Sequence, residues 1–280
     1  MRGKFQLCPL RFMPILGRME GQTPSARRFL QHLSSIVWLM IDMAHEMGDN
    51  MFRGRPPFRV AIFFEQTDRA GVGSVPLVAL VSFFLGLTMS LLTGYQLRPY
   101  GTERLVPGLV AIGFSRELGP LITGIMVAAR IGAAFTAELG TMTVSEEVEA
   151  IEAMGIGPLR FLVAPRVLAV FLLMPCLVVI SNVMADLGAA LICKWQLAIP
   201  LLYFGDLVHT SIESRDIIAG TVKSFLFGLI VGVVSCYKGL SVEGGAAGVG
   251  DSTTSSVVIA ITTVIICDTL CNIVLVAIYP

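Results

Sequence analysis

The residues of this sequence that could carry out chemistry are charged side chains inside long apolar segments. Five positions stand out in this way: Arg116, Glu117, Arg130, Glu138 and Asp268. An unpaired charge near the centre of a bilayer costs at least about 2.5–3.5 kcal/mol, so each of these groups needs a partner, a headgroup or water. Neighbouring residues on a helix point about 100° apart, so Arg116 and Glu117 should pair with other helices rather than with each other. The set favours a polar seam or a lipid-headgroup contact; the alternative is anchoring of helix ends together with buried ion pairs between helices. Lys223 is expected to extend to the membrane surface. Asp268 is expected to be a buried hydrogen-bond partner, and the alternative is a position near the interface.

A second candidate is a short acidic segment over residues 141–158, TMTVSEEVEAIEAMGIGP. Thr143 and Glu146 have the spacing of a capping box and Gly155 is typical of a helix stop, so the pattern predicts a helix over about 144–154. An apolar stripe and acidic flanks suit docking in a groove of a partner protein. The residues expected to make this contact are Glu146, Glu147, Val148, Glu149, Ile151, Glu152 and Met154. The alternative is an interfacial turn on lipid headgroups, which four glutamates beside an anionic leaflet disfavour.

Sequence motifs for catalysis, nucleotide binding and metal binding do not occur. The three histidines form no HExxH motif, and neither GxSxG nor GxxxxGK[ST] is present. The six cysteines form no CxxC pair and are expected to be small packing residues. The glycine-rich run over 239–251 has the wrong spacing for a phosphate site and is expected to be a loop, with Asp251 or Ser252 capping the next helix. The sequence therefore indicates no catalytic residue, no metal and no cofactor in this chain.

The elements that must position these residues are membrane spans. Hydrophobic residues make up 55% of the 280 residues and charged residues 14%, against roughly 25% charged residues in a soluble domain. This composition excludes a disordered protein and a basic nucleic-acid binder, and it favours a polytopic membrane protein. About 20 apolar residues suffice to cross a bilayer. The predicted fold is all-α with five spans, at about 71–97, 105–139, 159–193, 217–238 and 252–279.

The residues before the first span are expected to form two regions. Residues 1–23 read as a flexible basic tail. Residues 24–47 have the apolar spacing of an amphipathic helix that lies in the membrane interface; the alternative is a soluble helix packed on a partner. A short segment over 58–70 is expected to be an interfacial elbow. Residues 24–70 are thus an interfacial region, followed by the five-span domain over 71–280.

The orientation of the spans follows from the basic residues. Half of the 20 Lys and Arg residues precede residue 71, and basic segments stay on the cytoplasmic side. We therefore expect a cytoplasmic N-terminus, a cytoplasmic acidic helix and, after five crossings, a C-terminus on the opposite side.

Small residues recur every four positions in the second span, at Gly124, Ala128 and Gly132. This spacing allows helix backbones to approach closely. The partner helix can belong to the same subunit or to a second copy, and the spacing leaves both open.

Two long blocks of this sequence closely resemble the MlaE-type permeases of lipid ABC transporters. They are SRELGPLITGIMVAARIGAAFTAELGTMTVSEEVEAIEAMGIGPLRFLVAPRVLA at 115–169 and GGAAGVGDSTTSSVV at 244–258, and a weaker correspondence extends from about Gly54 to the C-terminus. The resemblance implies a homodimer in a bacterial inner membrane, with the C-terminus in the periplasm. Each copy would receive a cytoplasmic ATPase that binds ATP and Mg²⁺, with 141–155 as the coupling helix. A subunit with mammalian-cell-entry-type domains would bind on the outer side, and the cargo would be phospholipid or a related lipid moved between inner and outer membranes.

A lipid site needs an apolar wall and a polar rim near one membrane face. The outer end of the first span and the start of the second offer both, because tyrosine rings suit the interface. The residues expected there are Met89, Leu92, Tyr95, Leu97, Tyr100, Glu117 and Leu118; the alternative is that they are ordinary anchors and packing residues. A different function, an ion-coupled carrier or channel, would use the intramembrane charges Arg116, Glu117, Arg130 and Asp268 as an ion path.

Overall fold

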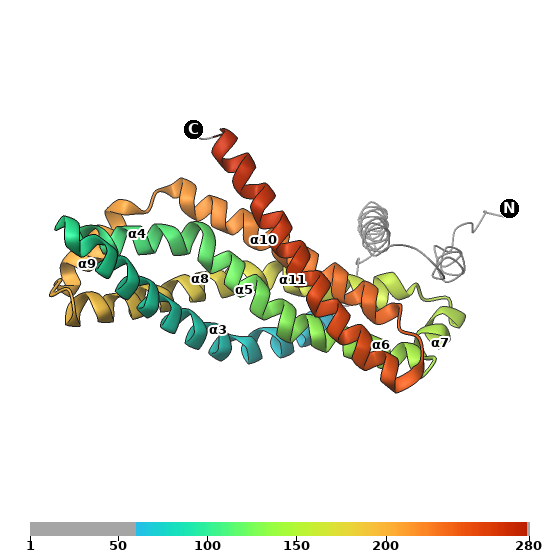
Figure 1. The fold of residues 1–280 in the computed structure, drawn as a ribbon. Helices are drawn as coiled ribbons and strands as arrows, with labels where there is room; N and C mark the ends of the chain where they lie inside the picture. The colour runs from blue at the N-terminus through green and yellow to red at the C-terminus, as the bar shows by residue number, and fades with distance from the viewer. Residues whose placement is uncertain (1–59, 279–280) are drawn as a thin grey trace, which may run out of the picture. The chain divides into compact units, whose positions relative to one another are not determined.

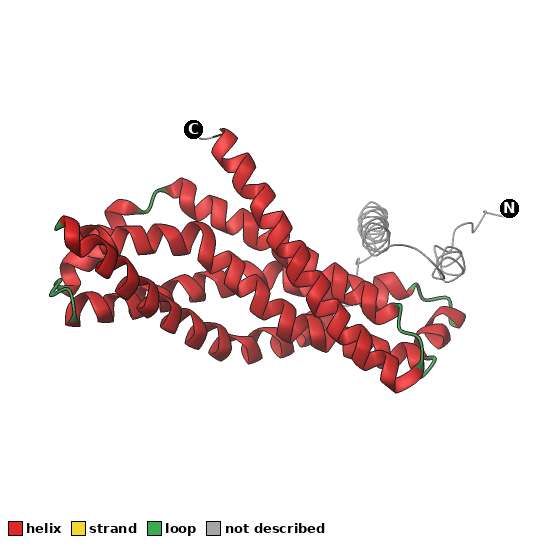
Figure 2. Cartoon of the chain, in the orientation of Figure 1, coloured by secondary structure: helices red, strands yellow, loops and turns green. Residues whose placement is uncertain are grey.

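The computed structural model describes residues 60–278, which form helices joined by short turns (Figures 1 and 2). The expected tail over 1–23 and interfacial helix over 24–47 lie outside the described residues. Residues 60–278 contain no strand, and five of their helical segments are long and apolar enough to cross a membrane. These segments are Gln66–Tyr100, Glu103–Val144, Phe161–Trp195, Ser214–Leu240 and Gly245–Ala277. The expectation of an all-α fold with five spans is confirmed.

The first span is one continuous helix, α3 (Val60–Leu97). Residues 60–70, expected to be a separate elbow, belong to this helix, because no break occurs at Gly71. Two short 3₁₀ segments follow it, η2 (Arg98–Tyr100) and η3 (Glu103–Leu105).

The second span alternates α-helical and π-helical turns. It consists of α4 (Val106–Gly113), η4 (Phe114–Leu118), α5 (Gly119–Val127), η5 (Ala128–Gly132) and α6 (Ala133–Val144). The segments η4 and η5 are π-helical and contain Arg116, Glu117 and Arg130. Single π turns inserted in α-helices are frequent at functional sites, so the charged residues of this span lie where its helical register changes.

The remaining helices include the other three spans, of which α10 and α11 begin before the segments expected at 217–238 and 252–279. They are α7 (Glu147–Ala153), η6 (Leu159–Val163), α8 (Ala164–Trp195), α9 (Leu201–Ser211), α10 (Ser214–Leu240) and α11 (Gly245–Ile278). The connection over 194–216, between the third and fourth expected spans, contains α9, whose Phe204 is buried against α4 and α8 residues. Figure 1 shows α7 and α9 at opposite ends of the bundle, which we call the α7 end and the α9 end.

The glycine-rich run over 239–251 is mostly helical, which corrects the expectation of a loop. The turn is confined to the residues just before α11, where Gly244 and Gly245 have positive φ angles of 88° and 70°. Glycine tolerates this conformation without steric cost, so the turn can be short and α11 starts at Gly245. Asp251 and Ser252 therefore lie inside α11 and do not cap it.

The closest helix contact is between α3 and α8. A Cβ added to Gly86 would lie 2.0 Å from the carbonyl oxygen of Ala185, and one added to Gly188 would lie 2.1 Å from that of Phe83. The hydroxyl groups of Ser82 and Ser181 are 2.7 Å apart in the same contact. In a bilayer the lipid tails are as apolar as the helix faces, so helices associate through close packing. Small residues such as glycine and serine allow the two backbones to approach this closely. The sequence reading missed this stripe of small residues.

The stripe that the sequence reading identified packs inside the subunit. Gly124 faces Phe227 of α10 and Val264 of α11 at 3.4 Å from an added Cβ, and Gly132 faces Ser235 of α10 at 2.8 Å. Ala128 between them is fully buried. The partner helix could belong to the same subunit or to a second copy. In the structure, the stripe packs against helices of the same chain.

Candidate functional site

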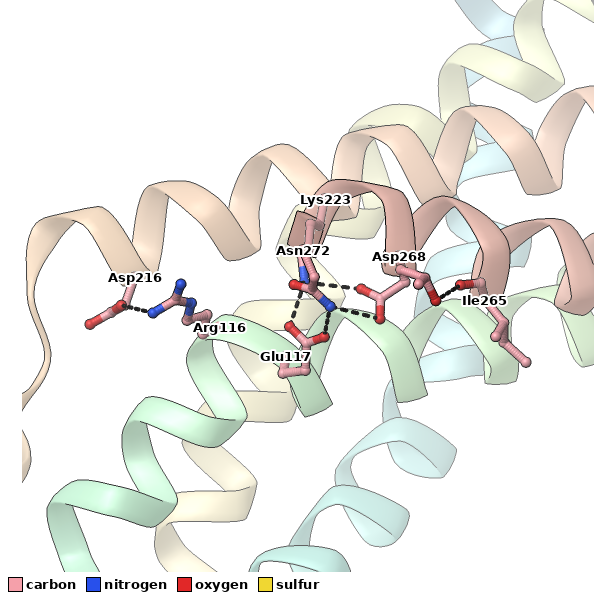
Figure 3. Close-up of polar contacts among 8 residues, drawn as sticks. Arg116, Glu117, Asp216, Lys223, Ile265, Asp268 and Asn272 are labelled. Carbon is pink, nitrogen blue, oxygen red and sulfur yellow. Dashed lines mark hydrogen bonds and ion pairs between the residues drawn. The ribbon is translucent and has the colours of Figure 1, made fainter. Parts of the chain in front are cut away.

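A cluster of polar side chains lies inside the bundle, where η4, α10 and α11 meet (Figure 3). Lys223 on α10 is 1% exposed, its Nζ donates to Asn272 Oδ1 at 2.7 Å, and it lies 3.0 Å from Asp268 Oδ1. The same ammonium group donates to Glu117 Oε2. The expectation that Lys223 extends to the membrane surface is wrong. Two carboxylates from neighbouring helices balance its charge, and an amide oxygen accepts a further hydrogen bond from it. The ammonium group can therefore remain buried.

Asn272 joins the two carboxylates of this cluster. Its Nδ2 donates to Glu117 Oε1 and lies 3.5 Å from Asp268 Oδ2. Asp268 is 6% exposed, which confirms that it is a buried hydrogen-bond partner. With all groups ionised, the cluster contains two negative charges and one positive charge. Because of this imbalance, the stability of the cluster depends strongly on its single lysine.

Arg116 and Glu117 pair with different helices, as expected for neighbours in a helical turn. Arg116 Nη1 lies 3.9 Å from Asp216 Oδ1 at the start of α10, and the arginine side chain is 39% exposed. Glu117 turns to the Lys223 cluster, so η4 contacts α10 at two charged positions. An arginine that keeps exposed N–H groups beside a paired carboxylate can also bind a phosphate, because guanidinium donors match phosphate oxygens.

The other intramembrane charges lie elsewhere. Arg130 is exposed, and its guanidinium lies against α3, since a Cβ on Gly73 would be 2.6 Å from Nη2. Glu138 near the α7 end pairs with Arg166 of α8 at 3.0 Å. Of the charges proposed for an ion path, only Glu117 and Asp268 are brought together. Arg116 instead pairs with Asp216 and Arg130 lies against α3, so the four charges do not form one cluster.

The acidic segment forms α7, shorter than the expected helix over about 144–154. Glu146 is the residue before α7 and has left-handed backbone angles, φ 59° and ψ 13°. Thr143 belongs to the last turn of α6, where its hydroxyl donates to the Leu139 carbonyl at 2.9 Å. The expected capping box between Thr143 and Glu146 is therefore wrong, because the hydroxyl bonds back into the preceding helix.

The expected stop of this helix at Gly155 is confirmed. Gly155 has φ 76° and its N–H donates to the Glu152 carbonyl at 2.8 Å, while the N–H of Ile156 donates to that of Ile151 at 3.2 Å. This pair of bonds is a Schellman motif, which glycine favours because it adopts the left-handed region freely.

The surface of α7 combines exposed acidic groups with an open apolar edge. Glu146, Glu147 and Glu149 are exposed, whereas Val148 and Ile151 are half-buried. Met154 at the end of the helix is 68% exposed. The α7 end therefore presents a short acidic helix with apolar side chains still accessible.

The residues expected to bind lipid fall into two groups. Leu92, Tyr95 and Tyr100 are exposed. Met89, Leu97 and Leu118 instead pack against the buried cluster at the α9 end, which consists of Val106, Val110, Phe114, Ala185, Ala189, Cys193, Ile199 and Phe204. Glu117 belongs to the Lys223 cluster. Only the first group can offer an accessible apolar and aromatic surface.

Sequence reasoning missed four residues of these polar contacts: Asp216 and Lys223 as ion-pair partners, Asn272, and Arg166. Asn272 had a signal, because a polar residue one turn after Asp268 in an apolar span lies on the same helix face. For Arg166 the signal was its position in an apolar stretch close to the α7 end.

The chain is similar to known permeases over most of its length. The Permease MlaE family profile matches residues 63–274. A probable ABC transporter permease protein of Rickettsia felis is 36% identical over 204 residues, which are 73% of this chain and 79% of that protein. A probable ABC transporter permease protein of Synechocystis is 33% identical over 72% of this chain and 77% of its own length. The Arabidopsis thaliana protein TRIGALACTOSYLDIACYLGLYCEROL 1, chloroplastic, is 37% identical over 73% of this chain and 58% of its own.

Proposed function

The chain belongs to the MlaE permease family, and from this we propose that it is the permease subunit of an ATP-driven transporter that moves phospholipid or a related lipid between inner and outer membranes. It is a multi-pass membrane protein. Its relatives are named ABC transporter permeases, which implies a partner ATPase. A permease subunit leaves ATP hydrolysis to that partner, which would bind ATP and Mg²⁺.

The observation that carries this proposal is the exposed α7. A partner that hydrolyses ATP must push on the permease through a surface outside the bilayer, and α7 is a helix at one end of the bundle with exposed glutamates and an accessible Met154. Apolar side chains in a polar rim are the usual anchors of a protein contact. We assign α7 and its flanking residues as the coupling helix.

The assignment orients the molecule. The α7 end faces the cytoplasm of a bacterial inner membrane, together with the N-terminus, and the C-terminus and the α9 end face the periplasm. There a subunit with mammalian-cell-entry-type domains would receive the lipid. Two copies of the permease would form a homodimer, each bound to one ATPase.

The lipid cargo is supported by chemistry at the α9 side of the bundle. Arg116 keeps an exposed guanidinium that can bind a headgroup phosphate. Leu92 and Tyr95 offer apolar and aromatic surface for acyl chains. The Arabidopsis relative carries the name of a glycerolipid, which also supports a lipid cargo.

The test is purification of the wild-type permease from its native membrane, followed by mass spectrometry of bound proteins and lipids. We expect an ATPase subunit and phospholipid. A triple variant, Glu146→Lys with Glu147→Lys and Glu149→Lys, should still insert but lose the ATPase and its stimulated hydrolysis. Full ATPase binding by the triple variant would refute the coupling assignment. Transport by the purified chain without any ATPase would instead support the ion-coupled carrier.

A further inference from the structure

An ion pair between a buried arginine and a half-exposed glutamate joins the two helices that lead into and out of α7. Arg166 at the start of α8 is 3% exposed, and its Nη2 lies 3.0 Å from Glu138 Oε1 of α6. The Nη1 of the same guanidinium donates to the Leu162 carbonyl at 2.9 Å, and its Cζ lies 6.0 Å from the centre of the Phe135 ring. The arginine is therefore held by η6, α6 and α8 together.

Fold stability alone is a weak reason for this pair. An ion pair with one buried partner is often no more stable than apolar residues of similar volume, because the buried charge, here that of Arg166, must leave water. Its distinguishing property is geometry: apolar contacts can slide past one another, whereas a charge-assisted hydrogen bond has a preferred length and direction. The pair holds α6 and α8 in one register, next to the helix that joins them.

The α6 helix is also bonded to the other two spans of its neighbourhood. Thr136 Oγ1 lies 3.0 Å from the Ser235 carbonyl oxygen of α10 and 2.8 Å from Ser256 Oγ of α11. These are the two helices that contain Lys223 and Asp268. A displacement of α6 therefore acts on α10 and α11 through hydrogen bonds as well as through apolar packing.

We propose that Arg166 and Glu138 are positioning residues that make α6 and α8 move as one body when the ATPase displaces α7. The inference rests on the proposed function and names the residues that transmit the movement. With the pair intact, a push on α7 shifts both arms and, through Thr136, α10 and α11. Without it, the two arms separate locally and ATP hydrolysis no longer drives lipid movement.

The experiment measures lipid moved per ATP hydrolysed by the complete transporter in vesicles that contain a fluorescent phospholipid. The main variant is Arg166→Met with Glu138→Leu, which removes both charges and leaves neither unpaired. We expect it to assemble with the ATPase, to unfold near the wild-type temperature and to hydrolyse ATP. Its lipid moved per ATP should fall by about tenfold, within the 5–150-fold range of typical coupling between sites.

A matched control and a second variant complete the test. Glu103→Gln removes a charge from the exposed Arg98–Glu103 pair at the α9 end, 3.6 Å apart, and should leave the ratio unchanged. Glu138→Gln keeps the side-chain size and an acceptor oxygen, and it should also lower the amount of lipid moved per ATP. If the double variant does not assemble, this single variant tests the proposal. A wild-type ratio in whichever of these two variants assembles would overturn the proposal and leave the pair a purely structural role. If the wild-type complex moved no lipid with ATP, the proposed function would fail first, and this inference with it.

Discussion

The ammonium group of Lys223 lies 3.0 Å from the carboxylate of Asp268, inside a membrane-spanning bundle, and the same lysine also bonds Glu117. One buried cation thus serves two carboxylates that come from different helices. The consequence is an asymmetry: the lysine is needed by both acids, while either acid can be neutralised with the other still paired.

We predict that Lys223→Met is far more damaging than Asp268→Asn. Loss of the lysine leaves the buried Asp268 carboxylate and the half-exposed Glu117 carboxylate without a counter-charge, and breaking a buried pair costs about 3–5 kcal/mol. Asp268→Asn keeps the shape and leaves Glu117 and Lys223 as a balanced pair, so it should cost about 1 kcal/mol or less. Thermal unfolding in detergent measures both, with Lys194→Met at the exposed end of α8 as the control. Equal losses for the two variants would show that charge balance does not govern the cluster.

The α3–α8 contact predicts a strict requirement for glycine. Gly86→Ala or Gly188→Ala places a methyl group within 2.0 or 2.1 Å of a backbone oxygen, and such overpacking costs about 1–3 kcal/mol. Gly113→Ala, on a helix where an added Cβ meets nothing within 4 Å, should instead be neutral or slightly stabilising. The unfolding temperatures of the three variants provide the measurement. A neutral Gly86→Ala would mean that the two helices are farther apart than described.

The exposed apolar edge of α7 predicts a binding defect without a folding defect. Met154→Asp should weaken ATPase binding by about tenfold or more, as expected when an anchor residue is lost. The unfolding temperature should not change, because Met154 is 68% exposed. Leu202→Asp on α9, where the side chain is 87% exposed, is the matched control at the opposite end and should bind the ATPase normally. Titration of the ATPase onto immobilised permease distinguishes these outcomes.

The division of the candidate lipid residues predicts different effects for two leucines. Leu92→Arg changes an exposed side chain and should reduce bound lipid while the protein remains folded. Leu97→Arg places a charge against the buried cluster at the α9 end and should lower stability as well, since an unpaired charge there is costly. Lipid extraction and thermal unfolding of the same samples test both. Full lipid retention by Leu92→Arg would place the cargo elsewhere.

The proposed orientation predicts opposite labelling of the two ends. Ala150 of α7 and Thr210 of α9 are both exposed, and each is replaced by a single cysteine. With a membrane-impermeant reagent, the cysteine at Ala150 should react only from the cytoplasmic side. The cysteine at Thr210 should react only from the periplasmic side. A cysteine at residue 280 should label like that at Thr210. Labelling of Ala150→Cys and Thr210→Cys from one side would contradict the topology.

The sequence by itself determined the class of fold and the kind of contacts that the charges must make. Long apolar segments with few charges have one stable arrangement in a bilayer, the helix, because every backbone polar group must be bonded internally. Five such segments were predicted, and residues 60–278 contain five. The neighbours Arg116 and Glu117 had to pair with different helices for reasons of helical geometry alone, and Gly155 ended α7 because it tolerates a positive φ.

Only the tertiary structure decided which helices supply the partners. Lys223 was misread because its burial depends on Glu117, Asp268 and Asn272, which hydrophobicity along α10 does not reveal. Glycine spacing indicated close packing for Gly132 but did not identify its neighbour. The closer contact of Gly86 with α8 gave no stronger signal in the sequence than other small residues of its span. Local patterns specify the secondary structure and the need for a partner. The identity of that partner depends on how five helices pack in three dimensions, where residues distant in the sequence become neighbours.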